Sequence, residues 1–164
     1  LEKSIQIPPS ILIQEGESKI FDLGERKIKI TAYPAAHTDN DVTITDIATG
    51  TLWAGDLLFI ERTPVIDGDI HGFIDVLGKL ISLDNINLVI PGHGTPTKNW
   101  QEAFKKSKDY FITLRDDIRH SIAEDQGLRE AMETVAKSES KKWELFDIQN
   151  ARNINQVYPK LEWE

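Results

Sequence analysis

The sequence predicts a single α/β domain in which the sheet comes first and most of the helices follow. Three observations lead to this prediction: short runs of β character up to residue 56, a strand, helix, strand order over residues 51–90, and helical periodicity after Thr97. We expect one domain for the whole chain, residues 1–164, because a single core commonly holds about 100–200 residues.

Short runs rich in β-branched residues predict strands in the first part of the chain. In KIKITAY (27–33) apolar and polar residues alternate, which indicates a strand with one buried side and one solvent-facing side. Only ATG separates VTITDI (42–47) from TLWAGD (51–56), so we expect a hairpin whose glycine takes a positive φ. The other predicted strands are SILIQ (10–14) and KIFD (19–22).

The apolar period changes from Gly72 onward. Apolar residues at helical spacing predict a short amphipathic helix that ends near Leu83, before DNIN. INLVI (86–90) is a continuous apolar run of strand length, and the turn PGHGTP follows it directly. The order strand, helix, strand predicts an α/β layer in which this last strand is covered on both faces.

After Thr97 the chain is expected to be helical to its end. Asp147 is the expected N-cap of the last helix, and Pro159 is expected to kink or end that helix. The apolar stripes that support these helices are Trp100, Ala103, Phe104, Phe111, Leu114 and Ile118; then Leu128, Met132 and Val135; then Ile148, Ala151, Ile154, Val157, Tyr158 and Leu161. The tryptophans expected in the core or between helices are Trp53, Trp100, Trp143 and Trp163.

The charge of the chain is concentrated in its middle. The net charge is −8, and residues 30–97 hold nine carboxylates against two cations, a net charge of −7. Such a field repels nucleic acid and favours a cation. The chain has no cysteine, so any metal ion must be held by histidine, carboxylate or backbone oxygen. No apolar run approaches the roughly 20 residues that a membrane span needs, and we expect no membrane partner.

Three separate stretches each offer one side chain that can bind a metal ion. His37 follows a predicted strand, Asp56 ends TLWAGD, and His93 lies in PGHG after the apolar run. Ligand sites of α/β folds usually lie at strand ends. Imidazole and carboxylate suit zinc, iron or manganese, and a carboxylate such as Asp56 can bridge two ions about 3.5 to 4 Å apart.

Each of these residues also has a purely structural explanation. A histidine in a loop is more often a surface or hydrogen-bonded residue than a ligand, and Asp56 can be an ordinary carboxylate at the end of a strand. Asp39 and Asp41 either cap turns through the backbone amides or support His37 from behind as it binds metal. No single one of these signals is specific.

The remaining two histidines have weaker claims. His71, in DGDIHGF, is either a surface residue or a substrate contact from a loop that overhangs the site. His120 lies near the end of the predicted long helix, where a partly charged imidazole favours the helix dipole, and no chemical role is expected there.

Taken together and in order, AHTDND, AGDLLF and PGHG resemble the second half of the metallo-β-lactamase fold superfamily. The resemblance covers about residues 10–164. It implies the C-terminal half of an αββα sandwich, a sheet with helices on its outer face. The stretches RTPVIDGDIHGFIDVLGKLISL and NARNINQVYPKLEWE further resemble the branch called quinoprotein relay system zinc metallohydrolases.

The resemblance implies a metal-dependent hydrolase, with zinc as the expected metal and iron or manganese as alternatives. In the intact protein His37 would ligate the first ion, His93 the second, and the catalytic Asp56 would bridge both. A metal-bound hydroxide would then attack an ester, thioester or amide of a small-molecule substrate. A single ion held by all three residues is a further alternative. The rival from another class is a non-catalytic acidic binding or assembly domain on the same scaffold.

The HxHxDH motif that defines the superfamily and supplies its other metal ligands does not occur in these 164 residues. We therefore expect this polypeptide to be a truncated domain that is inactive, and metal-free or weakly loaded, on its own. Half of a sandwich exposes the inner apolar face of its sheet. We expect two copies to pair through that face as a homodimer. Members of the branch that this chain resembles tend to be exported, which implies the periplasm, with the cytoplasm as the alternative.

Overall fold

The structure, a computed structural model, describes residues 8–164 and confirms the predicted α/β class. Residues 1–7, the start of the predicted domain, lie outside the described residues. The elements in chain order are β1 (Ser18–Asp22), β2 (Lys27–Ala32), β3 (Val42–Asp46), β4 (Thr51–Phe59), α1 (Ile70–Ile81), β5 (Leu88–His93), α2 (Trp100–Ala123), α3 (Leu128–Thr134), the short 3₁₀ helix η1 (Lys137–Glu139) and α4 (Phe146–Leu161).

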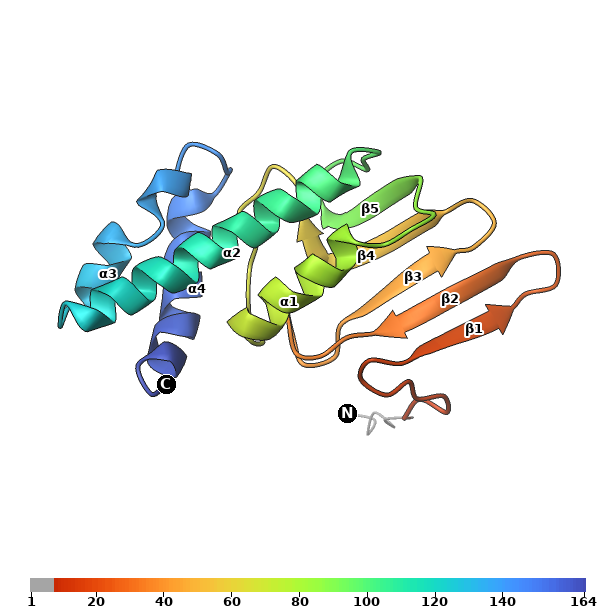
Figure 1. The fold of residues 1–164 in the computed structure, drawn as a ribbon, viewed down its shortest axis with the longest axis horizontal. Coiled ribbons are helices and arrows are strands. Elements are labelled where there is room, and N and C mark those ends of the chain that lie inside the picture. Colours follow the sequence, from red (N-terminus) through yellow and green to blue (C-terminus); the bar gives the residue numbers. More distant parts are fainter. Residues whose placement is uncertain (1–7) are drawn as a thin grey trace, which may run out of the picture.

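The five strands form one mixed sheet in the order β1-β2-β3-β4-β5. The first three pairs are antiparallel, and β4 pairs with β5 in parallel across the α1 crossover. Consequently β2, β4 and β5 all run in the same direction, and their carboxyl ends meet at one edge of the sheet (Figure 1). The candidate metal ligands His37, Asp56 and His93 are predicted to lie at strand ends, and this is the edge on which those strands end.

The β3–β4 hairpin forms as predicted. Gly50 has a φ of +64°, and its amide donates to the carbonyl of Asp46 at 2.9 Å. A Cβ at this position would lie 2.6 Å from the carbonyl oxygen of Asn85, so both the backbone conformation and the neighbouring loop require glycine.

Two predicted strands differ from the structure. SILIQ (10–14) has no strand conformation and is largely exposed, because no neighbouring chain pairs with it in the described part of the protein. The fifth strand begins two residues later than INLVI and continues through Pro91 and Gly92 to His93. It is an edge strand on which only Val89 and Pro91 are buried, so the prediction that both of its faces are covered was wrong.

The helices begin and end at slightly different residues from those predicted. The first begins at Ile70, because the Asp69 side chain accepts a hydrogen bond from the Gly72 amide at 2.8 Å and caps it. The last begins after Leu145, whose φ is +56°, so Asp147 lies in the first turn and is not the N-cap. Pro159 lies in the last turn of α4, and the helix continues for two residues beyond it to Leu161.

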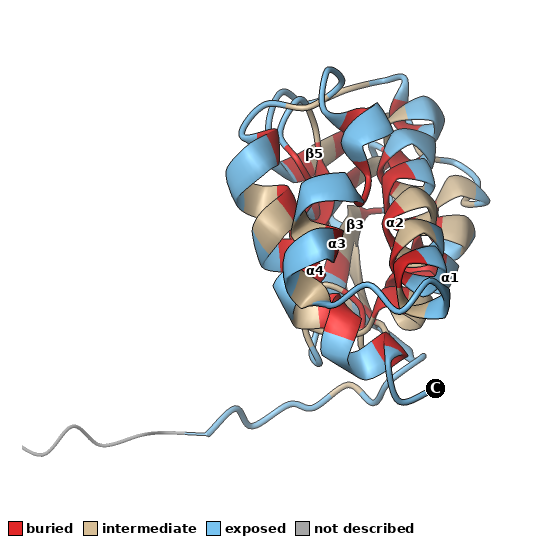
Figure 2. Cartoon of the chain, turned by 90° about the vertical axis from the view of Figure 1, so that its left-hand side faces the viewer, coloured by how far each residue is buried: buried red, intermediate tan, exposed pale blue. Residues whose placement is uncertain are grey.

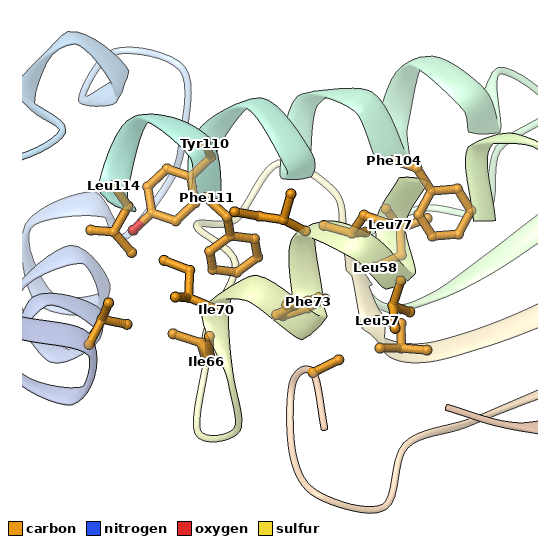
Figure 3. Close-up of a cluster of buried hydrophobic side chains, with 14 of the residues drawn as sticks. Leu57, Leu58, Ile66, Ile70, Phe73, Leu77, Phe104, Tyr110, Phe111 and Leu114 are labelled. Atoms are coloured by element: carbon orange, nitrogen blue, oxygen red, sulfur yellow. The ribbon is translucent and has the colours of Figure 1, made fainter. Parts of the chain in front are cut away.

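The hydrophobic core lies between one face of the sheet and helices α1 and α2. Phe73 and Leu77 of α1 meet Phe104 and Phe111 of α2 above the buried part of β4 (Figure 3). The helices turn their buried residues inward and their exposed residues outward (Figure 2). Among the tryptophans, Trp100 is buried and Trp143 is partly buried, as predicted. Trp53 and Trp163 are 40% and 87% exposed, so their placement in the core was wrong.

The other face of the sheet carries apolar side chains without a covering layer among the described residues. Leu52 and Ala54 of β4 are fully buried beneath the helices, so Trp53 between them points to the opposite face. The strand register places five further apolar residues on that face, and each is only partly buried. We call this set the open sheet face: Phe21, Ile28, Ile30, Ile44, Trp53 and Ile90.

No helix in the described part of the chain is long and apolar enough to cross a membrane.

Candidate metal centre

The three predicted ligands meet at the carboxyl edge of the sheet. His37 follows β2, Asp56 lies in β4, and His93 is the last residue of β5. The Nε2 atom of His37 lies 3.6 Å from Oδ2 of Asp56, and the Nε2 atom of His93 lies 3.4 Å from Oδ1 of the same carboxylate. Each imidazole therefore faces a different oxygen of one carboxylate.

Asp56 lies inside β4 and does not end the strand as predicted. The register between β4 and β5 shifts on both sides of Gly55, which has a φ of +54°. This bulge turns the Asp56 side chain out of the core, where it is 44% exposed, while Leu57 beside it is buried. A Cβ on Gly92 would lie 2.1 Å from Asp56 Oδ1, so the neighbouring strand can pass the carboxylate only because it carries glycine.

The orientation of His37 is fixed by a backbone carbonyl. Its Nδ1 lies 2.8 Å from the carbonyl oxygen of Val65, which can only accept, so Nδ1 carries the proton. In the neutral imidazole the other ring nitrogen, Nε2, then has the free lone pair, and it points at Asp56. The amides of Asp67 and Gly68 donate to the His37 carbonyl at 2.8 and 2.7 Å, which ties the same segment to the backbone of His37.

His93 is held by its neighbours in the sheet. Its ring stacks on Phe59 with the centroids 4.9 Å apart and the planes 16° apart. Its carbonyl accepts a hydrogen bond from the Ile60 amide at 2.9 Å. The residue thus ends a paired strand, and its side chain remains 46% exposed toward Asp56.

The two loop aspartates differ in what they do. Asp41 accepts from the Thr38 amide through Oδ2 and from the Thr38 hydroxyl through Oδ1, both at 2.9 Å. This closes the loop that carries His37, so Asp41 acts on the histidine through the backbone. Asp39 is exposed on the same loop.

The other histidines lie away from this edge. His71 lies on the first turn of α1 and not in a loop, and its Nε2 is 2.6 Å from Oε1 of Glu164. Hydrogen bonds from Arg119 and His71 hold the pKa of Glu164 below its usual range. His120 lies in the last turn of α2, as predicted.

The arrangement fits metal ligation as two pairs. Two ligands about 2.0 to 2.1 Å from a tetrahedral ion lie about 3.3 to 3.4 Å apart, close to both observed separations. The donors are a neutral imidazole nitrogen and a carboxylate oxygen in each pair, which suit zinc, iron or manganese. Within residues 8–164, no three histidine, aspartate or glutamate side chains converge closely enough to hold one ion by themselves. The described geometry therefore offers two incomplete sites that share Asp56, and not one three-ligand site.

The candidate ligands line an open cavity of about 250 Å³. Its other charged lining residues are Arg62, Asp67 and Arg152. Arg152 donates to both carboxylate oxygens of Asp67, at 2.6 and 2.8 Å, while Arg62 is exposed. A larger cavity of about 720 Å³ also borders Phe59 but contains none of the candidate ligands.

Sequence reasoning missed the Val65 carbonyl and the stacking of Phe59. A backbone oxygen has no sequence signature of its own. The only sequence signal for this region is that residues 62–72 belong to the stretch that resembles a hydrolase branch. That resemblance does not indicate which residue contacts His37.

No family model and no curated protein matches this sequence. Solved structures do match. The sec-alkylsulfatase Pisa1 from Pseudomonas sp. has a TM-score of 0.76 at 15% identity, over 93% of this chain and 26% of that chain. A metallo-β-lactamase from Pontibacter korlensis has a TM-score of 0.52 at 16% identity, over 58% of this chain and 46% of that chain. TMB-1 gives 0.50 at 16% identity, over 63% and 47%.

The chain therefore shares its fold with these solved structures, a sulfatase and metallo-β-lactamases, and this is the fold that the motifs predicted. It spans about a quarter of the sulfatase chain and about half of the lactamase chains. Its place in the C-terminal half of the domain, and in the quinoprotein relay branch, stay predictions.

Proposed function

We propose that this chain supplies one side of the metal site of a metal-dependent hydrolase, with zinc as the expected metal. The observation that carries the proposal is that two imidazoles face the two oxygens of Asp56, with the lone pair of His37 directed by Val65. A surface carboxylate between two histidines would have no need of a fixed tautomer. The hydrolase fold of the structural neighbours supports the same class of reaction.

The residues present would divide the work. His37 would hold one ion, His93 a second, and Asp56 would bridge them. Such ions, when bound, supply Lewis acidity and activate water as a nucleophile. The protein's own contribution is rigidity, since each donor is anchored by a bulge, a carbonyl or an aromatic ring. The open cavity beside them would admit the ester, thioester or amide group of a small substrate.

Titration of the chain with Zn²⁺ and with Co²⁺, followed by calorimetry and by the visible spectrum of cobalt, tests this proposal. We expect weak binding that Asp56→Ala removes, because the sites are incomplete and the carboxylate is shared by both histidine pairs. Asp75→Ala, which removes an exposed carboxylate of α1, is the matched control and should bind as the parent chain does. In a longer protein that contains this chain together with the remaining metal ligands, Asp56→Ala should lower the number of metal ions bound per chain from two.

The outcome also separates the two candidate classes. Unchanged affinity and stoichiometry in Asp56→Ala would contradict the assignment of this residue. If neither this chain nor a longer protein that contains it binds Zn²⁺ or Co²⁺, the result would instead favour the acidic binding or assembly domain.

A further inference from the structure

The segment that fixes His37 is itself buried without regular secondary structure. Residues 63–66 are all buried, although none of them belongs to a helix or strand. Their backbone polar groups must therefore find partners in other parts of the chain. The Thr63 amide donates to the Glu144 carbonyl at 3.1 Å, and the Val65 carbonyl accepts from His37. The backbone groups of Pro64 and Ile66, on either side of Val65, form hydrogen bonds with a side chain of α4.

The side chain of Asn153 in α4 forms hydrogen bonds with the backbone on both sides of Val65. Its Nδ2 donates to the Pro64 carbonyl at 2.7 Å, and its Oδ1 accepts from the Ile66 amide at 3.2 Å. The side chain is fully buried, and these contacts join positions 87 and 89 residues apart in the sequence. The side-chain amide thus supplies the acceptor and the donor that the backbone of a neighbouring strand would otherwise supply. Because it holds residues 64 and 66, it fixes the direction of the Val65 carbonyl between them.

A buried tyrosine explains which way this amide faces. The Tyr110 hydroxyl donates to Oδ1 of Asn150 at 2.9 Å, so it can only accept from Nδ2 of Asn153, also at 2.9 Å. Burial raises the pKa of Tyr110, so its hydroxyl keeps the proton that this arrangement needs. Both donors of Nδ2 are thereby used, and Oδ1 is left to accept from the Ile66 amide.

Other α4 side chains bind the same segment from the surface. Gln156 donates to the Asp67 carbonyl at 2.8 Å, Arg152 pairs with the Asp67 carboxylate, and Lys160 donates to the Gly68 carbonyl. These groups are exposed, so solvent competes with them and salt screens the charged ones. Within the described chain, Asn153 is the buried member of this set of contacts.

We propose that Asn153 is a positioning residue for the candidate metal centre: it holds the Val65 carbonyl in place, and this carbonyl sets the tautomer and ring orientation of His37. The consequence for metal rests on the proposed function, whereas the consequence for the tautomer does not. Partners behind a ligating histidine of this kind typically change metal affinity by about 10- to 100-fold when they are lost.

The first test reads the tautomer of His37 in the metal-free chain. The spectra are recorded in alkaline buffer, where a free imidazole is neutral. Long-range ¹H–¹⁵N spectra, with His37→Gln to assign the signals, should show Nδ1 protonated and Nε2 unprotonated in the parent chain. In Asn153→Ala we expect the two ring nitrogens to shift toward averaged values, because the Val65 carbonyl is no longer fixed.

Ser121→Ala is the matched control. Ser121 of α2 is also buried, and its hydroxyl donates to Oε1 of Gln126 at 2.9 Å, but it bonds neither residues 63–68 nor the pair Tyr110 and Asn153. A merely structural role for Asn153 predicts the same spectrum in both variants. If Asn153→Ala does not fold, Asn153→Ser gives the same comparison, because its shorter side chain cannot reach both the Pro64 carbonyl and the Ile66 amide and it buries no charge. A parent-like His37 spectrum in a folded Asn153 variant would overturn the proposal.

The second test is the Co²⁺ affinity of the same variants. We expect at least a tenfold loss in Asn153→Ala and a change of less than about threefold in Ser121→Ala. If the parent chain binds no cobalt, the proposed function loses its support, but the tautomer result still decides the role of Asn153.

Discussion

At the residue scale, the missing side chain of Gly92 decides where Asp56 can lie. A Cβ there would lie 2.1 Å from Asp56 Oδ1 and 2.7 Å from the Gly55 carbonyl. Gly92→Ala should therefore push the carboxylate away from the two imidazoles, as well as cost about 1 to 3 kcal/mol of stability through overpacking. Cobalt titration and urea unfolding of the variant measure the two effects separately.

Gly78→Ala provides the control for this substitution. Its Cβ would meet only the flexible end of Lys108 at 3.0 Å, and alanine is favoured over glycine inside a helix by about 1 kcal/mol. We expect Gly78→Ala to keep the cobalt affinity of the parent chain and to be no less stable. Parent-like cobalt binding by Gly92→Ala would show that the close approach of β5 does not position Asp56.

The candidate ligands could be predicted from the sequence, and their supports could not. His37, Asp56 and His93 each stand beside a strand in a recognisable motif, and the common direction of three strands brings them together. The Val65 carbonyl and Asn153 act across 28 and 87 residues through backbone atoms. Any residue carries a carbonyl, so no pattern of side chains marks the one that faces His37.

At the element scale, the β3–β4 hairpin depends on a buried carboxylate. Asp46 ends β3, accepts from the Ala48 amide at 3.0 Å, and pairs with Arg26 at 2.9 Å. Burial raises the pKa of Asp46, but hydrogen bonds from Thr49 and Ala48 and the charge of Arg26 outweigh it and hold the pKa below its usual value. The folded state therefore prefers the ionised form of this side chain.

The sign of the resulting pH dependence follows directly. A carboxyl whose pKa is lowered on folding contributes stability above its unfolded pKa, near 3.8, and loses it as the pH falls through the folded value. Asp46→Asn should thus be less stable than the parent chain at neutral pH, and the difference should narrow in acid. Urea unfolding from neutral pH down to pH 3 measures this, with exposed Asp84→Asn as the control. A difference that stays constant with pH would contradict the role given to the charge.

Elements were predicted well where local pattern and tertiary partners agree. KIKITAY alternates and has a neighbour on each side, so it forms β2 nearly as expected. SILIQ has similar composition but no pairing partner among the described residues, and a strand without a partner has no reason to be extended. The fifth strand continues into PGH because β4 continues beside it, which the turn-like letters of that stretch conceal.

At the scale of the whole molecule, the layers are unequal. Helices α1 and α2 cover one face of the sheet (Figure 1). The strand register places an apolar row from Phe21 to Ile90 on the other, the open sheet face. Solved lactamase chains of the same fold are about twice as long as the part that this chain matches. An apolar face of this extent is rarely left in water.

The whole-molecule prediction is that two copies of this 164-residue chain pair through the open sheet face. The same register also places Lys19 and Asp46 on this face, and Asp46 is already paired with Arg26 at 2.9 Å. A second copy therefore meets the apolar row without burying an unpaired carboxylate, and two twisted sheets pack well face to face. Light scattering at micromolar concentration should give a dimer.

Trp53→Lys should give a monomer, because it places a charge in the middle of the row. Trp163→Lys, which makes the same change at a residue 87% exposed in the turn after α4, should remain a dimer. A monomeric parent chain would contradict self-pairing, and an unchanged dimer in Trp53→Lys would assign the contact to another surface.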